Sequence, residues 1–137
     1  WGKKLFKVEG VPLSLNDIEH RILRPIWQDP RIHYLINCAS IGCPNLQPIA
    51  LTGRNVSAIL KAAAREFVNH PRAVSYDGGR LILSKLYQWY AEDFGGDDES
   101  IIFHISQFAN SRLRERLKHQ KSIADFEYDW TLNKGQL

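Results

Sequence analysis

The stretch Ala73-Val-Ser-Tyr-Asp-Gly-Gly-Arg-Leu-Ile-Leu83 contains the clearest fold signal in the sequence. Two short runs rich in strand-forming residues flank Asp77-Gly78-Gly79, and glycine readily adopts the positive φ angles that a tight hairpin turn requires. The stretch therefore predicts a β-hairpin, with one strand over residues 73–76 and the other over residues 80–83.

Helices are predicted on both sides of this hairpin. Before it, apolar residues recur with a helical period, so a long amphipathic helix is expected over roughly residues 53–69. After it, Ser84 has the position of a cap for a helix over residues 86–94, and further helices are expected over residues 100–109 and 112–119.

The N-terminal part of the chain is predicted to form a strand and a helix. Residues 4–9 alternate between polar and apolar side chains, which is typical of a short strand. Ser14 and Asp17 have the spacing of a box-like cap for a helix over about residues 15–23, and Pro25 is expected to end that helix.

Residues 31–38 are predicted to form a central strand, because apolar side chains would lie on both of its faces. A last short strand is expected over residues 123–128. This order of elements predicts an α+β domain, with a small central sheet that includes the hairpin and four to five helices packed around it. We expect the large aromatic residues Trp89, Tyr90, Phe94 and Trp130 to pack in the core.

Composition limits the class of protein. A chain of 137 residues that is 44% hydrophobic and 24% charged has the make-up of one folded domain. No apolar run reaches the roughly 20 residues of a membrane-spanning helix. The net charge of +3 is small, and no zinc-finger spacing or RNA-binding aromatic motif occurs, so a nucleic-acid partner is not expected.

Four blocks of sequence follow one another in a fixed order. They are Leu13-Ser-Leu-Asn-Asp-Ile-Glu-His20 with Ile22-Leu-Arg-Pro25, Asp29-Pro-Arg-Ile-His33 leading into Asn37-Cys-Ala-Ser-Ile-Gly-Cys-Pro44, Leu83-Ser-Lys85 through Trp89-Tyr90 to Asp93-Phe-Gly-Gly96, and Tyr128-Asp-Trp-Thr-Leu-Asn133. Together they resemble the family called domain of unknown function 547, and the resemblance covers almost all of the chain.

The resemblance implies that residues 1–137 are a single domain without its N-terminal helical segment, because the family's domain usually begins earlier. We therefore expect an apolar face that the missing segment or another chain would cover. The family's name assigns no activity, so the resemblance informs the fold more than the chemistry.

Cys38 is the first candidate for chemistry, because the Asn37-Cys38-Ala39-Ser40 segment would follow a strand and enter a loop of small residues. As a nucleophile it would need a base, and we prefer His20 to His33 and His104. His33 would point to the opposite face of the predicted strand. Glu19 is the candidate to orient that base.

Two alternatives compete with a nucleophile. Cys38 could pair with Cys43 in a disulfide, which would suit a secreted or periplasmic protein, whereas free thiols would suit the cytoplasm. Arg24, Arg31 and Ser40 could form an anion site near the same loop. No metal site and no cofactor is expected, because two cysteines without clustered histidines do not complete a zinc site.

Two functional hypotheses follow. One is a ligand- or protein-binding module with a cleft at residues 37–40, where His33, Asn37, Ser40, Arg24 and Arg31 contact a peptide or a small anionic ligand. The other is a papain- or transglutaminase-like thiol enzyme, in which Cys38 attacks in acyl transfer or amide hydrolysis. The sequence favours the binding module, because it contains no complete set of nucleophile, base and oxyanion hole.

Overall fold

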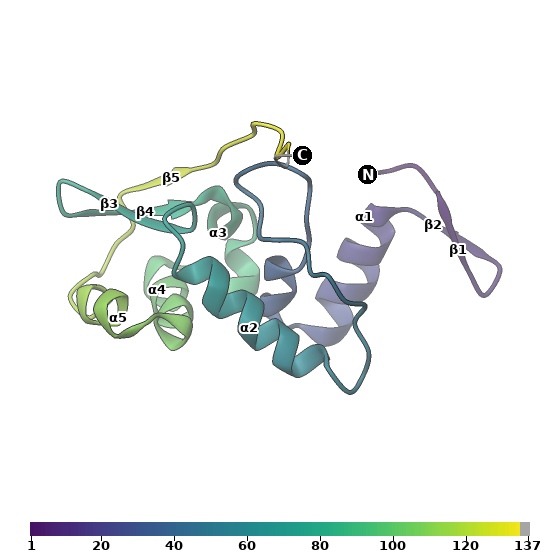
Figure 1. The fold of residues 1–137 in the computed structure, drawn as a ribbon, viewed down its shortest axis with the longest axis horizontal. Helices are drawn as coiled ribbons and strands as arrows, with labels where there is room; N and C mark the ends of the chain where they lie inside the picture. The colour runs from purple at the N-terminus through teal and green to yellow at the C-terminus, as the bar shows by residue number, and fades with distance from the viewer. Residues whose placement is uncertain (135–137) are drawn as a thin grey trace.

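The computed structural model describes residues 1–134 and has an α+β fold (Figure 1). A small hairpin of β1 (Phe6–Val8) and β2 (Val11–Leu13) comes first in the chain. A three-stranded sheet contains β3 (Val74–Asp77), β4 (Arg80–Ser84) and β5 (Asp125–Glu127), in the order β3-β4-β5. The α+β class predicted from the order of elements is confirmed.

The β3–β4 hairpin lies where its turn residues predict. Asp77 pairs with Arg80, so Gly78 and Gly79 alone make the turn, with φ angles of 54° and 84°. Two consecutive positive φ angles match the right-handed twist of the strands that they join. The prediction of a hairpin at Asp77-Gly78-Gly79 is confirmed.

The central strand of the sheet is β4, not the segment 31–38 that the sequence favoured. β4 pairs with β3 on one side and, in parallel, with β5 on the other. Leu81, Ile82, Leu83 and Ser84 are all buried, as expected for a strand covered on both faces.

The prediction of a strand over residues 31–38 is wrong. Pro30–Tyr34 forms a short 3-10 helix, η2, and the residues after it are irregular. The Asp29 side chain accepts a hydrogen bond from the Arg31 N–H, and Pro30 has the first helical position, where its fixed φ angle is favourable. This capped turn buries the adjacent residues His33 and Tyr34, which a strand would have turned to opposite faces.

The long helix α2 (Val56–Val68) supplies one side of the core. Its buried positions recur at helical spacing, and Phe67 contacts Tyr34 of η2 with ring centroids 5.7 Å apart. Tyr34 is fully buried, and its hydroxyl lies 2.9 Å from His104 Nε2 and 3.3 Å from the Tyr87 hydroxyl. The core is therefore built around a hydrogen-bonded tyrosine.

The remaining helices follow the hairpin in the predicted order. They are α3 (Lys85–Trp89), η3 (Ala91–Phe94), α4 (Asp98–Phe108) and α5 (Ser111–Leu117). Ser84 caps α3 as expected, but the predicted helix over residues 86–94 is divided at Tyr90 into α3 and η3.

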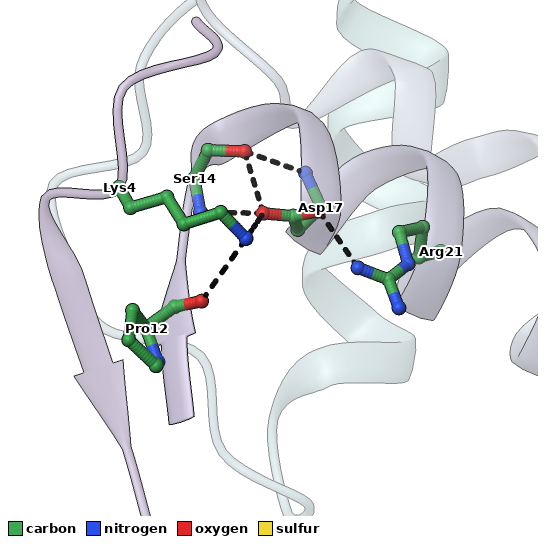
Figure 2. A network of polar contacts seen from close by, with 5 residues as sticks. All are labelled: Lys4, Pro12, Ser14, Asp17 and Arg21. Atoms are coloured by element: carbon green, nitrogen blue, oxygen red, sulfur yellow. Dashed lines mark hydrogen bonds and ion pairs between the residues drawn. The ribbon is translucent and has the colours of Figure 1, made fainter. Parts of the chain in front are cut away.

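The N-terminal helix begins at the predicted cap. Ser14 and Asp17 form a capping box, in which each side chain binds the backbone N–H of the other (Figure 2). Lys4 Nζ donates to Asp17 at 3.3 Å and to the Pro12 carbonyl at 3.4 Å, and Arg21 donates to Asp17 at 3.0 Å. Backbone and hydroxyl hydrogen bonds from Ser14, together with Arg21, hold the pKa of Asp17 well below its usual range.

Pro25 does not end this helix, contrary to the sequence prediction. After one α-helical turn, α1 (Leu15–Asp17), the chain continues as a π-helix, η1 (Ile18–Trp27), and stops at Gln28 with a φ angle of 49°. In the wider π-helical turn, the carbonyl four residues back no longer lies directly below the proline ring, so the usual clash is relieved.

The β1–β2 hairpin stands away from the rest of the molecule (Figure 1). Its apolar side chains Phe6, Val8 and Val11 are exposed, and so are Ile26 and Trp27 of η1. Whether a missing segment or another chain covers such residues stays a prediction. Within residues 1–134, no helix is long and apolar enough to cross a membrane.

Candidate functional site

The loop after η2 carries the two cysteines, and a disulfide joins Cys38 to Cys43. The Asn37 side chain holds the loop at both ends, since it accepts from the Ala39 N–H and donates to the Pro44 carbonyl, both at 2.8 Å. Cys43 is buried and Cys38 is exposed. The loop therefore presents one sulfur to the surface on a backbone fixed by a covalent bond and by side-chain hydrogen bonds.

Residues 128–133, which we call the C-terminal strap, lie along this loop (Figure 1). The Ile41 and Gly42 N–H groups donate to carbonyls of the strap at 2.8 and 2.9 Å, and the Asn133 N–H donates to Ala39 at 2.7 Å. A Cβ atom at Gly42 would lie 2.9 Å from the Tyr128 ring, so glycine is needed for this approach.

The strap also brings a tyrosine hydroxyl to the disulfide. Tyr128 Oη lies 2.8 Å from Ser40 Oγ and 3.1 Å from each cysteine sulfur. Ser40 is buried, and its hydroxyl also lies within hydrogen-bond distance of both cysteine sulfurs. The polar groups beside Cys38 are thus two hydroxyls, and both are engaged with the disulfide.

Three aromatic side chains form a wall next to the loop. Trp89 of α3 lies 4.8 Å from Tyr128 and 5.4 Å from Trp130 between ring centroids, and Tyr128 and Trp130 are 4.6 Å apart. We call these three residues the aromatic wall. Trp89 is 45% exposed and Trp130 is 66% exposed, so the expectation that both pack in the core is wrong.

The aromatic wall and the cysteine loop enclose a pocket of about 430 Å³, which we call the cysteine-loop pocket. Its residues come from segments far apart in the sequence: α1, η1, η2, the cysteine loop, α3 and the strap. The residues that line it are Trp1, Asn16, Glu19, His20, His33, Ile36, Cys38, Cys43, Pro44, Leu86, Trp89, Tyr90, Tyr128 and Trp130.

Glu19 is a buried carboxylate at this pocket, with 5% of its surface exposed. Its Oε1 has no hydrogen-bond partner, and its Oε2 lies 4.0 Å from His20 Nε2, which is too far for a hydrogen bond. A buried polar atom without a partner costs free energy, so such an atom calls for an explanation.

His33 lies between the pocket and a charged pair. Its Nε2 donates to Asp93 at 2.7 Å, and its ring stacks on Tyr90 with centroids 3.9 Å apart. Arg24 donates twice to the same carboxylate, at 2.5 and 2.9 Å. The Arg24 hydrogen bonds lower the pKa of Asp93, while burial lowers the pKa of His33 despite that neighbour.

Some of the candidates named from the sequence come together in the cysteine-loop pocket. Cys38, His20, Glu19 and His33 all line it. His20 is exposed, and its Nδ1 lies 3.1 Å from an Arg24 nitrogen.

The other candidates lie elsewhere. Arg24 pairs with Asp93 and Arg31 pairs with Asp29, so each guanidinium has its own carboxylate, and neither lines the cysteine-loop pocket. His104 contacts Tyr34 in the core, and burial lowers its pKa to about 4. Within residues 1–134, no cluster of three or more His, Cys, Asp or Glu side chains is arranged to hold a metal ion.

Four residues of the site were missed as functional candidates: Asp93, Trp89, Tyr128 and Trp130. All four belong to sequence blocks that resemble the family, and that position was the available signal. Asp93 contacts His33 and Tyr128 contacts Ser40, and both contacts join residues that are far apart in the chain.

Asp93 lies 60 residues after His33, and Tyr128 lies 88 residues after Ser40. No local pattern in the sequence brings such residues together, so these contacts could be found only in the folded chain.

Comparison with known proteins supports the resemblance for the first part of the chain. Residues 1–68 match the family model described as "Protein of unknown function, DUF547". The predicted resemblance is thereby confirmed, while the blocks after residue 68 lie outside the match. No curated protein and no solved structure matches the chain.

Proposed function

We propose that this chain is a ligand-binding module and that the cysteine-loop pocket is its binding site. The observation that carries the proposal is the aromatic wall, whose two tryptophans are about half exposed or more at the edge of a concave site. Large aromatic side chains normally bury their surface, and exposed ones around a pocket are typical of binding sites.

The rigidity of the loop supports the same proposal. The disulfide, the Asn37 hydrogen bonds and the C-terminal strap all restrict the backbone around Cys38. A site that is already ordered loses less conformational entropy when a ligand binds, which favours affinity. A disulfide of this kind would also suit an oxidising compartment.

The tryptophans of the chain provide a direct test. Trp1, Trp89 and Trp130 line the pocket, whereas Trp27 lies on η1 and does not, so the indole N–H signals in NMR contain an internal control. A fragment set of indoles, phenols, amines and carboxylic acids should contain members that shift the first three signals and leave that of Trp27 unchanged.

A blocking variant makes this test specific. Asn16 is an exposed residue at the pocket, so Asn16→Phe should obstruct it and abolish the fragment-induced shifts. Lys61→Phe places the same ring on the exposed face of α2, away from the lining residues, and should leave the shifts intact. Shifts that survive Asn16→Phe, or no shifts with any fragment, would contradict the proposal.

A thiol enzyme is the second candidate, because Cys38, His20 and His33 line one pocket. We rank it below binding, since acyl transfer needs a free thiolate and the Cys38 sulfur is bonded to Cys43. After mild reduction, an activated Cys38 would react with iodoacetamide well below the pH at which an ordinary thiol does. Alkylation of Cys38 only at alkaline pH would remove this candidate.

A further inference from the structure

The cysteine-loop pocket is lined by one carboxylate, that of Glu19, and by several aromatic side chains. This combination favours one class of ligand. We infer that the pocket takes an organic cation with an N–H group and an apolar body, held between the Glu19 carboxylate and the aromatic wall. This inference rests on the proposed function, since it names the ligand class of the same pocket.

The first argument is the unpartnered oxygen of Glu19. The side chain is almost fully buried at the pocket, and its Oε1 has no donor within hydrogen-bond geometry among the described residues. The Tyr90 hydroxyl is a neighbour of the carboxylate, and burial together with Glu19 raises the pKa of Tyr90. A carboxylate accepts hydrogen bonds and donates none, so the group that completes it must carry a hydrogen. An ammonium N–H supplies both that hydrogen and the opposite charge.

The second argument is the charge of the surroundings. Among the described residues that line the pocket, Glu19 is the only Asp, Glu, Lys or Arg. Arg24, the nearby cation on η1, already forms two hydrogen bonds to Asp93. Burial lowers the pKa of His33, which favours the neutral form of this ring. The acidic side chain that a ligand meets in this pocket is therefore Glu19.

The third argument is the aromatic wall itself. Cations are attracted to the faces of tryptophan and tyrosine rings, and the methylene groups next to an ammonium pack on the same surfaces. Trp89, Tyr128 and Trp130 provide such rings at the pocket. The N–H requirement of Glu19 sets this site apart from one that would prefer a quaternary ammonium.

Matched probes test the inference in the unmodified protein. Phenylbutylamine, phenylbutanol and phenylpentanoate share one apolar body and differ in charge, and their affinities can be compared by titration of tryptophan fluorescence. We expect the amine to bind about tenfold more tightly than the alcohol, and the acid to bind more weakly than both. The trimethylammonium derivative of the amine should bind more weakly than the amine.

A variant then assigns the preference to Glu19. Glu19→Gln keeps the shape of the side chain and removes its charge, so the ratio of the amine affinity to the alcohol affinity should fall to about one. Glu92→Gln removes an equal charge from an exposed residue that does not line this pocket, and should leave the preference intact. Melting curves establish that both variants fold; if Glu19→Gln does not, the comparison of probes in the unmodified protein decides.

The outcomes separate this inference from the proposed function. Equal affinity of amine and alcohol, or tighter binding of the acid or of the trimethylammonium derivative, would overturn the inference and leave a binding pocket in place. Absence of binding by every probe would overturn both. Nα-acetyl-lysine methylamide, which keeps a free ε-ammonium group, distinguishes the source of the cation. If it binds more tightly than phenylbutylamine, the ligand is a lysine side chain of a polypeptide rather than a free amine.

Discussion

The titration of His104 should make the stability of this protein depend on pH. Burial is the largest cause of its low pKa, about 4 in the folded chain against an ordinary value of 6.5. A base whose pKa is lowered by folding binds protons more readily in the unfolded state. Its contribution to stability is therefore fully present above the unfolded pKa and is lost as the pH falls toward the folded pKa.

The size of the effect follows from the two pKa values. Between about pH 7 and about pH 5, protonation of His104 in the unfolded chain should lower the free energy of unfolding by about 2 kcal/mol. His33 has a pKa shifted in the same direction by burial, so it adds to the loss in the unmodified protein. The part due to His104 must be isolated by a variant.

His104→Gln provides that isolation. Glutamine does not titrate and can still hydrogen-bond to the Tyr34 hydroxyl, which lies 2.9 Å from the His104 ring. Urea denaturation gives the free energy of unfolding at each of the two pH values. Its decrease from the higher to the lower pH should be smaller by about 2 kcal/mol in this variant than in the unmodified protein. His119→Gln, at an exposed position, is the matched control for the loss of a histidine. If the free energy of unfolding decreased equally in His104→Gln and in the unmodified protein, the inference that burial lowers the pKa of His104 would be refuted.

Two further substitutions test the contacts that build the site. Gly42→Ala should lower the free energy of unfolding by about 1–3 kcal/mol and alter tryptophan fluorescence, because the new Cβ would lie 2.9 Å from the Tyr128 ring and displace the strap. The control Gly53→Ala should change neither quantity, because nothing lies within 4 Å of a Cβ at that position. Asp93→Asn should lower the free energy of unfolding, measured by urea denaturation, by about 2–3 kcal/mol, because a partly buried arginine loses its ionised partner. The control Asp77→Asn removes an exposed ion pair and should lower the same free energy by less than about 0.5 kcal/mol.

Each of these comparisons has a result that would contradict it. Equal stability losses for the two glycine variants would mean that the strap does not pack on Gly42. Equal losses for the two aspartate variants would mean that the charged pair beside His33 contributes no more than a surface pair.

The parts of the fold that could be predicted from the sequence are those that local chemistry determines. Gly78 and Gly79 supply the positive φ angles of the hairpin turn, and Ser14 and Asp17 cap a helix within three residues of each other. The apolar period of α2 likewise needs no distant partner. In each case the residues that decide the structure are neighbours in the chain.

The errors have physical causes as well. Residues 31–38 have strand-like composition, but the cap formed by Asp29 and Pro30 starts a helical turn and overrides that propensity. The pairing of β4 with β5 joins Ile82 to Asp125, a long-range contact that no local pattern indicates. Cys38, His20 and Glu19 were recognised as candidates by residue type, whereas Trp89 and Trp130 were assigned to the core because the sequence does not show which aromatic side chains stay exposed.

The C-terminal strap has a consequence for the order in which the molecule folds. The helices and the β3–β4 hairpin precede residue 118 and can form as the chain leaves the ribosome. The pocket cannot form with them, because Tyr128 and Trp130 emerge after all of these elements and must return to a loop near residue 40. A nascent chain that stops before Tyr128 would therefore contain most of the core but only part of the pocket, so ligand binding should appear only after Trp130 has been added.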